Sequence, residues 1–339
     1  MPAVTADTLT LPRLPKVADA DADWRPVAGI VTAHRQLEGE GFEVRRPFPS
    51  AGLSLADPFL LLDHLGAVEY APGEAKGAPW HPHRGFETVT YMIDGVFEHE
   101  DSTGGGGLIT DGATQWMTAG AGILHSELPP QDFVAKGGLF HGTQLWVNLP
   151  ASAKWNPPTY QDIGANDVKL LSSEDGGALV RVIAGEIAGH KGPGSTYTPI
   201  TYLHATLSRG SRLVLPWPKA FNALVYALSG DGYAGHPSRE GPVPIKEGQL
   251  AVFGPGGAID VRANEVQAAP QDDKWDILVL GGLPIGEPVA RYGPFVMNTR
   301  DEIVQAYEDF RSGRLATITP RDMAHRTSAD GPAPEARKN

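Results

Sequence analysis

The sequence predicts an all-β protein that contains two similar domains in tandem and one short helix near its C-terminal end. Among its 339 residues are 41 Gly and 30 Pro, well above ordinary usage, which indicates many turns. Short apolar runs recur between Gly, Pro, Asn and Asp residues, as they do in strands joined by turns. Part of this pattern occurs twice at a nearly fixed spacing, which indicates duplicated domains.

The composition narrows the possible functions. The chain has no cysteine, so disulfides, thiolate metal sites and a cysteine nucleophile are excluded, and a bound metal must use histidine, carboxylate or water ligands. The formal net charge of −12 disfavours direct nucleic-acid binding, because phosphate contacts need clustered Lys and Arg. No apolar run approaches the ~20 residues that span a membrane. The N-terminus lacks the basic start and apolar core of a signal peptide, so we expect a cytoplasmic protein.

The two ends of the chain lack the strand pattern. Residues 1–25 are rich in Ala, Asp and Pro without periodicity, so we expect a flexible N-terminal arm. Residues 318–339 have the same character and are expected to form a flexible tail. The chain between them is expected to divide into an N-terminal domain at residues 26–150 and a C-terminal domain, including the helix, at residues 151–317.

Strand signals are clearest in the first domain. Residues 86–93 (FETVTYMI) are rich in β-branched and aromatic side chains, and Asp94-Gly95 after them is a strong hairpin-turn signal. Residues 143–148 (TQLWVN) alternate in the manner of a half-buried strand.

A single helix is predicted, from about residue 301 to residue 311. Asn298 or Thr299 can cap its start, and Gly313 follows its end. Its apolar face would consist of Ile303, Tyr307 and Phe310.

The internal repeat links two pairs of segments. Residues 86–95 match residues 221–230 at an offset of 135, with Phe, Tyr and the closing Gly in common. Residues 111–117 match residues 247–253 at an offset of 136, where an acidic residue and Gly precede an apolar strand. Two signals at nearly the same offset favour duplicated domains over chance similarity.

Two short motifs in the first domain predict a metal site. His81-Pro82-His83 places two imidazoles at i and i+2, which on a strand puts both on one face, roughly 7 Å apart at the backbone. Pro82 cannot donate to a strand ladder, so the motif should lie at a strand start or a sheet edge. His125 and Glu127 repeat the spacing with an imidazole and a carboxylate. Two such strands across a small barrel would bring three nitrogens and one oxygen together, which suits a divalent transition metal with one or two positions open for water, substrate or dioxygen.

The repeat predicts that only the first domain binds a metal in this way. At the offsets above, every candidate ligand is matched in the second domain by a residue that cannot bind metal. The counterparts of His81, His83, His125 and Glu127 are, in that order, Pro216, Pro218, Val261 and Ala263.

Glu87 is the main alternative to Glu127 as the carboxylate ligand. On a straight strand it would lie about 13 Å from His83, too far to share a metal, although a bend at Gly85 could bring it closer. We therefore expect Glu127 to be the ligand, and Glu87 to be a candidate base or a support for the ligands. A salt bridge, for example to Arg84, is the structural alternative for Glu87.

Other notable side chains are expected to have different roles. His99 is expected in a solvated turn, and His64 and His141 as polar partners in or beside the barrel. Trp80 could line an aromatic pocket, whereas Trp116 is expected to pack in the core.

Several longer segments resemble the pirin family of bicupin proteins. The resemblance covers roughly residues 26–315. The matching segments are residues 57–63 (DPFLLLD), 81–89 (HPHRGFETV), 115–127 (QWMTAGAGILHSE), 144–149 (QLWVNL) and 293–299 (GPFVMNT).

The resemblance implies a fold and a cofactor. The fold is two cupin β-barrels of the jelly-roll type in tandem. The N-terminal barrel would bind one divalent metal, with Fe(II) as the first expectation and Cu, Mn, Ni, Co or Zn as compatible alternatives. The implied ligands are His81, His83, His125 and Glu127, and the second barrel would hold no metal.

Two functions are compatible with this resemblance. Several pirin-like proteins are similar to quercetin 2,3-dioxygenases, which open a flavonol ring with dioxygen and release carbon monoxide. A small aromatic substrate would then bind at the metal, and Glu127 or Glu87 would take the proton of its hydroxyl. The alternative is a non-catalytic, redox-sensitive iron protein that regulates a protein partner, such as a transcription factor or a metabolic enzyme.

Overall fold

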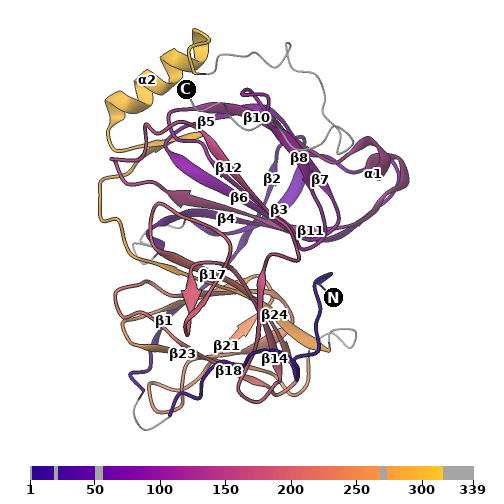
Figure 1. The fold of residues 1–339 in the computed structure, drawn as a ribbon, viewed down its shortest axis with the longest axis vertical. Coiled ribbons are helices and arrows are strands. Elements are labelled where there is room, and N and C mark those ends of the chain that lie inside the picture. The colour runs from indigo at the N-terminus through magenta and orange to yellow at the C-terminus, as the bar shows by residue number, and fades with distance from the viewer. Residues whose placement is uncertain (1, 19–21, 50–55, 268–272, 316–339) are drawn as a thin grey trace.

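The computed structural model describes residues 2–18, 22–49, 56–267 and 273–315. These residues form two β-barrels stacked along the long axis of the molecule, with a helix at the outer end of the first barrel (Figure 1). The architecture confirms the predicted all-β fold with two barrel domains and a short C-terminal helix.

Each barrel consists of a seven-stranded sheet and a four-stranded sheet, and all strand pairs within them are antiparallel. In the first barrel, the large sheet has the order β12 (Thr159–Ile163), β9 (Thr114–Thr118), β6 (Phe86–Asp94), β11 (Gly138–Asn148), β4 (Phe59–Tyr70), β3 (Phe42–Phe48) and β2 (His34–Glu38). Its small sheet has the order β5 (Ala78–His83), β10 (Ile123–Leu128), β7 (Phe97–Asp101) and β8 (Gly106–Ile109).

The second barrel repeats this arrangement. Its large sheet has the order β1 (Val27–Thr32), β22 (Gln249–Phe253), β19 (Leu224–Ser229), β24 (Lys274–Gly282), β17 (Ile200–Ser208), β14 (Ala178–Ala184) and β13 (Lys169–Ser172). Its small sheet has the order β18 (Arg212–Pro216), β23 (Ala258–Ala263), β20 (Asp231–Ala234) and β21 (Val243–Lys246). Two short hairpins complete the strands: β15 (Glu186–Ile187) with β16 (His190–Lys191), and β25 (Ala290–Tyr292) with β26 (Phe295–Met297).

The two repeat signals fall on equivalent strands. The first pair corresponds to β6 and β19, which are third in their sheets, and the second pair to β9 and β22, which are second. The duplication inferred from the sequence is therefore a duplication of barrels.

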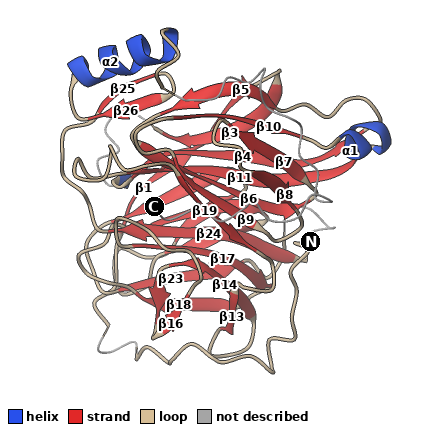
Figure 2. Cartoon of the chain, turned by 45° about the horizontal axis from the view of Figure 1, so that its top comes forward, coloured by secondary structure: helices blue, strands red, loops and turns tan. Residues whose placement is uncertain are grey.

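The two large sheets pack face to face (Figure 2). One continuous apolar cluster joins Val89, Tyr91 and Leu145 of the first barrel to Tyr226 and Leu278 of the second. Alternate residues of the same strands point into each barrel instead. Each large sheet is thus buried on both faces, which explains why β6 and β19 are almost entirely apolar or buried.

Edge strands cross the expected domain boundaries. β1 lies in the 26–150 segment, yet it pairs with β22 of the second barrel. β12 lies in the 151–317 segment, yet it pairs with β9 of the first. Each barrel thus takes one edge strand from the segment that was assigned to the other domain.

Residues from the expected N-terminal arm lie along the second barrel in the structure. The backbone N–H of Leu14 donates to the carbonyl of Ser172 at 2.8 Å, and the Leu14 side chain is buried in the second barrel's core. Trp24 is also buried and forms a bridge to Ala258. The expected tail at residues 318–339 lies outside the described residues.

The predicted helix is α2 (Arg300–Arg311). Thr299 caps its start in a capping box with Glu302, and Ile303 is buried on its inner face. A second helix, α1 (Gln131–Lys136), was not predicted, because its six residues are too few to show a repeating apolar pattern. Neither helix of the described residues has the length and apolar character of a membrane-spanning helix.

The C-terminal segment with β25, β26 and α2 returns to the first barrel. The N–H of Val296 donates to the carbonyl of Arg84 at 3.0 Å, and Arg84 forms a buried ion pair with Asp309 of α2 at 2.9 Å. The buried ammonium of Lys154 donates to the carbonyls of Gly85 and Val296, at 2.7 and 3.1 Å. These contacts fix the segment beside the loop that follows β5.

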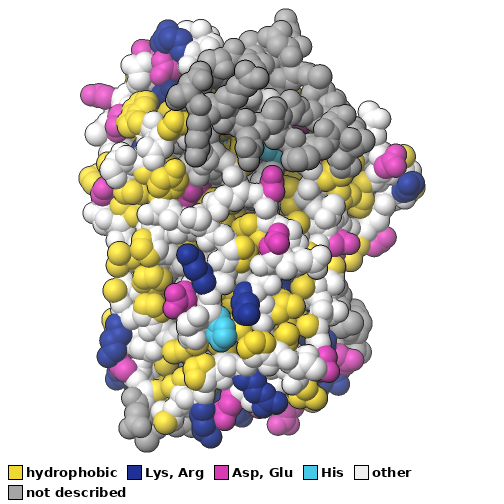
Figure 3. Space-filling model, in the orientation of Figure 1, with side chains coloured by type: hydrophobic (Ala, Val, Ile, Leu, Met, Phe, Trp, Pro, Cys, Tyr) yellow, Lys and Arg dark blue, Asp and Glu magenta, His cyan; other side chains and the backbone are white. Residues whose placement is uncertain are grey.

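Among the described residues, the face of the molecule in Figure 3 has no large patch of only basic or only acidic side chains. Lys and Arg side chains are interspersed with Asp and Glu across the described part of this face. The expectation that the protein does not bind nucleic acid directly stays a prediction.

Candidate metal centre

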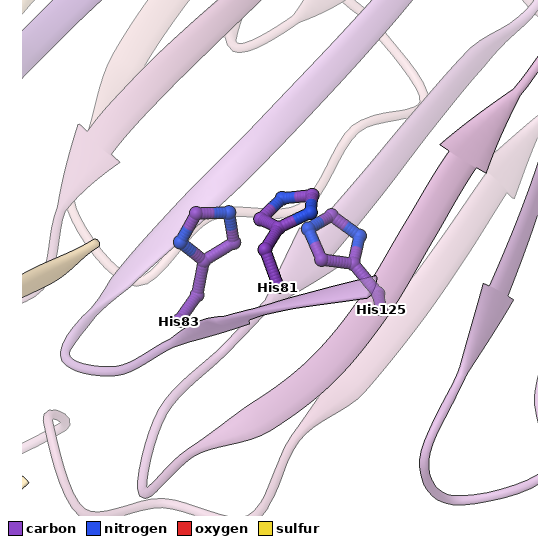
Figure 4. A group of neighbouring side chains, drawn as sticks. All are labelled: His81, His83 and His125. Carbon is purple, nitrogen blue, oxygen red and sulfur yellow. The ribbon is translucent and has the colours of Figure 1, made fainter. Parts of the chain in front are cut away.

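Three histidines from two neighbouring strands converge in the first barrel. His81 and His83 lie on β5 and His125 lies on β10, where it is the cross-strand partner of His81. One ring nitrogen from each lies within 4.8 Å of the others. Figure 4 shows the three rings on the same side of their strands, turned toward one another.

The backbone around β5 explains how the two histidines of the motif reach the same face. Pro82 occupies the intervening position and pairs with Leu124 of β10, so strand alternation turns His81 and His83 together to the other side. Gly85 then makes the turn into β6 with a φ of 90°. A Cβ at Gly85 would meet the carbonyl oxygen of Val296 at 1.9 Å, so only glycine fits there.

Hydrogen bonds orient two of the rings. Nδ1 of His81 lies 2.8 Å from the carbonyl of Pro79, and Nδ1 of His83 lies 3.3 Å from the carbonyl of Pro294. Because a carbonyl can only accept, each Nδ1 must carry the proton, which leaves Nε2 with a free lone pair. Metal-binding histidines commonly have this arrangement.

The chemistry of the three side chains fits a bound metal. Burial, followed by the charge of His81, lowers the pKa of His83 well below 6.5. Burial, followed by the charges of His81 and His83, does the same for the pKa of His125, so both rings are neutral ligands at neutral pH. Neither ring nitrogen of His125 has a hydrogen-bond partner among the described residues. A buried imidazole without partners is costly, and coordination would satisfy it.

Glu127 lies in the same cavity but outside the group of three nitrogens. Its Oε1 accepts from the hydroxyl of Thr90 at 2.8 Å, and its Oε2 accepts from the amide of Gln144 at 3.4 Å. Glu127 is buried, with 6% of the residue exposed. Its role as the fourth ligand stays a prediction.

The structure does not bring Glu87 to this group. On β6, Val89 and Tyr91 belong to the core between the barrels, and strand alternation puts Glu87 on that same face. Its carboxylate accepts from the hydroxyl of Thr118 at 2.8 Å, and burial raises its pKa to about 7. The bend at Gly85 therefore does not turn Glu87 toward the histidines.

Three of the other side chains discussed from the sequence lie where they were expected, and His99 does not. Trp116 is fully buried in the core, and Nε2 of His64 lies 3.0 Å from Nε2 of His141, so both expectations are confirmed. His99 is not in a solvated turn: it is 2% exposed on β7 and pairs across the small sheet with Glu127. The alternation of Phe97, His99 and Asp101 was the sequence signal for this strand.

A cavity of about 550 Å³ opens beside the metal group. This volume lies within the range of small-molecule sites. Its polar lining includes His81, His83, Glu127, Thr90 and Gln144. Its aromatic lining consists of Phe42, Trp80, Phe97 and Trp146.

Sequence reasoning missed the residues that support this site. Thr90 and Gln144 lie within the recognised strand segments, and their positions alternate with the apolar face, which was an available signal. Pro294 and Arg291 reach the cavity from the C-terminal segment, and no local pattern indicates that return.

Strand register changes one detail of the repeat. β10 pairs His125 with His81, and β23 pairs Val261 with Leu213, so the counterparts of His81 and His83 are Leu213 and Leu215 rather than Pro216 and Pro218. The offset changes because two residues join β5 to β6, whereas residues 217–223 join β18 to β19. The second barrel still lacks all four candidate ligands.

Two family models match the chain. Residues 41–147 match the model described as pirin, and residues 202–316 match the model described as the pirin C-terminal cupin domain. Each model covers most of the strands of one barrel.

Related proteins match over nearly the whole chain. A Pseudomonas aeruginosa protein provisionally named a quercetin 2,3-dioxygenase is 41% identical over 294 residues, 86% of this chain and 98% of its own. Pirin of Rattus norvegicus is 41% identical over 295 residues, 86% of this chain and 94% of its own. The crystal structure of a quercetin 2,3-dioxygenase from Acinetobacter baumannii has a TM-score of 0.79 and 38% identity, covering 87% of this chain and 99% of that chain.

Proposed function

The chain belongs to the pirin family of bicupin proteins, and on this premise we propose that it is a metal-dependent dioxygenase that acts on flavonols such as quercetin. The relatives named for quercetin 2,3-dioxygenase activity support this choice of reaction. The reaction consumes one flavonol and one dioxygen, opens the central ring and releases carbon monoxide.

The observation that carries the proposal is the position of the three-histidine group beside the cavity. Their ring nitrogens lie within 4.8 Å of one another, while His81 and His83 also line a cavity of about 550 Å³. A metal held there would be reached directly by a ligand in the cavity. We assign His81, His83, His125 and Glu127 as its ligands.

The metal would supply a Lewis acid for the flavonol 3-hydroxyl and a site for dioxygen chemistry, with Fe(II) as our first choice. Three imidazoles and one carboxylate can bind several divalent metals, so the choice of metal rests on the family alone.

Glu127 is the residue that we propose to receive the hydroxyl proton. Thr90 and Gln144 each hold one of its oxygens, which fixes the direction of the carboxylate toward the cavity. A carboxylate in this position can act as a general base only while it is ionised. Glu87 has no part in this proposal, because it lies on the other face of β6.

The aromatic walls would hold a flat substrate. The Trp146 ring packs edge-on against His83, with the ring centres 5.2 Å apart, and against Phe86 at 4.3 Å. This packing fixes Trp146 beside the metal end of the cavity. Aromatic walls favour planar apolar ligands and exclude water around them.

The test is turnover of quercetin by protein loaded in turn with iron, copper, manganese, nickel and cobalt. We expect loss of the flavonol's visible absorbance and release of one carbon monoxide per quercetin consumed. Glu127→Gln, which keeps the shape of the side chain but removes the charge, should reduce turnover by about 10²-fold or more.

Glu69→Gln is the matched control, because Glu69 is exposed on β4 and away from the cavity lining. Absence of flavonol consumption with every metal would contradict the dioxygenase proposal and leave the redox-sensitive regulator as the remaining candidate. Full activity in His83→Ala would contradict the proposed site.

A further inference from the structure

One cation in the cavity wall is not accounted for by the metal site. Arg291, on β25, lines the cavity. Its guanidinium carbon lies 4.7 Å from the centre of the Trp146 ring, and that ring packs against His83. Trp146 thus contacts both the cation and a candidate metal ligand.

The guanidinium of Arg291 is held in place by contacts other than a direct ion pair. Its Nη1 donates to the carbonyl of Leu60 at 3.1 Å, and stacking on Trp146 restricts its plane. Within the described residues, no carboxylate oxygen lies within 4.0 Å of a guanidinium nitrogen of Arg291. Arg291 is also only partly buried and lines the cavity, so its side chain is accessible to a ligand there.

A neighbouring arginine shows the contrasting case. Arg46 also lines the cavity, but its Nε donates to Asp63 at 2.6 Å and its Nη2 lies 2.7 Å from Glu38. Two carboxylates therefore neutralise Arg46, and it offers little to a ligand. Arg291 is the arginine of this pair that is left to bind an external anion.

A purely structural role for Arg291 is the competing explanation. Arg46 shares its single charge with both Asp63 and Glu38, so a nearby second cation would balance the group. Such balance acts through space and does not require Arg291 to line the cavity or to stack on Trp146. The two roles differ in what they predict for ligand binding.

We propose that Arg291 binds a carboxylate on the ligand of the metal cavity, so that the preferred ligand is an aromatic acid. The planar guanidinium fork matches a carboxylate with two parallel hydrogen bonds. The partly buried position strengthens the attraction relative to open water. The inference rests on the proposed function for the metal end of the cavity, and a flavonol would use that end alone.

The test compares two probes of nearly equal size, 2-naphthoate and 2-naphthamide. Their dissociation constants are measured by calorimetry on the metal-loaded wild type and on Arg291→Gln. A control, Arg35→Gln, removes an exposed arginine of β2 that pairs with Glu43 at 2.9 Å. The preference of each protein for the acid is the dissociation constant of 2-naphthamide divided by that of 2-naphthoate. Direct binding of the carboxylate to the metal affects this ratio equally in all variants, so it cancels when the proteins are compared.

We expect the preference for the acid to be at least tenfold larger in the wild type than in Arg291→Gln. Arg35→Gln should keep the wild-type value. Arg291→Lys, which keeps the charge but loses the planar fork, should give an intermediate value.

Equal preferences in the wild type and Arg291→Gln would overturn the inference, as would failure of the wild type to bind either probe at millimolar concentration. Lower stability of Arg291→Gln with an unchanged preference would assign Arg291 to charge balance alone. The result is independent of turnover. A tenfold preference without flavonol consumption would refute only the dioxygenase proposal, and flavonol consumption with equal preferences would refute only this inference.

Discussion

The two barrels have the same arrangement of strands, but the interior of the first is polar near the metal group and the interior of the second is apolar. Where the first barrel turns histidines inward, the second has aliphatic side chains at the positions matched by strand register. The counterparts of His81, His83 and His125 are Leu213, Leu215 and Val261. The residues around the carboxylate follow the same rule, because Glu127, Thr90 and Gln144 correspond to Ala263, Val225 and Val279.

This difference separates what the fold needs from what the site needs. All six apolar counterparts are at most 1% exposed and belong to one core, so the second barrel uses its interior for packing. The first barrel buries polar groups in the same place, and some of them, such as both ring nitrogens of His125, lack partners among the described residues. The framework tolerates either interior, and unpaired polar groups in the first one lower its stability until a ligand satisfies them.

The largest effect is expected from a substitution that removes a metal ligand of the first barrel. His125→Ala removes the ligand that links β10 to β5, so the metal content should fall from about one ion per chain to near zero, and turnover by at least 10²-fold. The measurement is metal analysis of purified protein together with the flavonol assay.

The control for this change is the matched position in the second barrel. Val261→Ala should leave the metal content unchanged and lower the free energy of unfolding by about 2 kcal/mol, because it opens a small cavity in the core. Loss of metal from Val261→Ala would show that the interiors are not independent.

A second comparison measures the loss of stability on substitution at two matched positions, one in each barrel. Leu213→Ala should reduce the free energy of unfolding by about 2–5 kcal/mol, as expected for a leucine that is fully buried. His81→Ala at the counterpart position should cost much less in metal-free protein, since it removes a polar side chain. Denaturant unfolding of metal-free samples measures both, and equal losses would contradict the assignment of the first interior to binding.

The third comparison concerns the sheet faces between the barrels, where Glu87 corresponds to Asn222 by the repeat. Burial raises the pKa of Glu87 from 4.5 to about 7, so the folded protein holds this proton more tightly than the unfolded chain does. Its stability should therefore fall as the pH rises from about 4.5 to about 7. Glu87→Gln cannot ionise and should lack this loss, which corresponds to roughly 3 kcal/mol at pH 8.

Thermal or denaturant unfolding of the wild type and Glu87→Gln at pH 5 and pH 8 measures this difference. Glu69→Gln, on an exposed part of β4, should follow the wild type at both values. A stability difference between wild type and Glu87→Gln that does not change with pH would contradict the buried, protonated carboxyl.

Local sequence patterns were sufficient for the repeated fold and for the core of the site. The i, i+2 spacing of His81 and His83 needed only strand alternation to be interpreted, and α2 was predicted within one residue of its start because Thr299 and Ile303 give it a cap and a buried face. These features depend on neighbours in the sequence.

The features that could not be predicted depend on distant partners. Glu87 faces the other barrel because of the direction in which β6 alternates, and only the packed sheets reveal which face is which. The exchange of β1 and β12 depends on which sheet edge is free in three dimensions. The cavity contacts of Pro294 and Arg291 require the chain to return across both barrels.

That return has a consequence for how the protein is made. The carbonyl that orients His83 belongs to Pro294, and Arg84 beside it is paired with Asp309, close to the end of the described chain. During translation, the ribosome releases the histidines long before these partners emerge. The nascent first barrel would therefore have to wait for residues 294–309 before its centre is complete, and metal loading would follow their release from the ribosome.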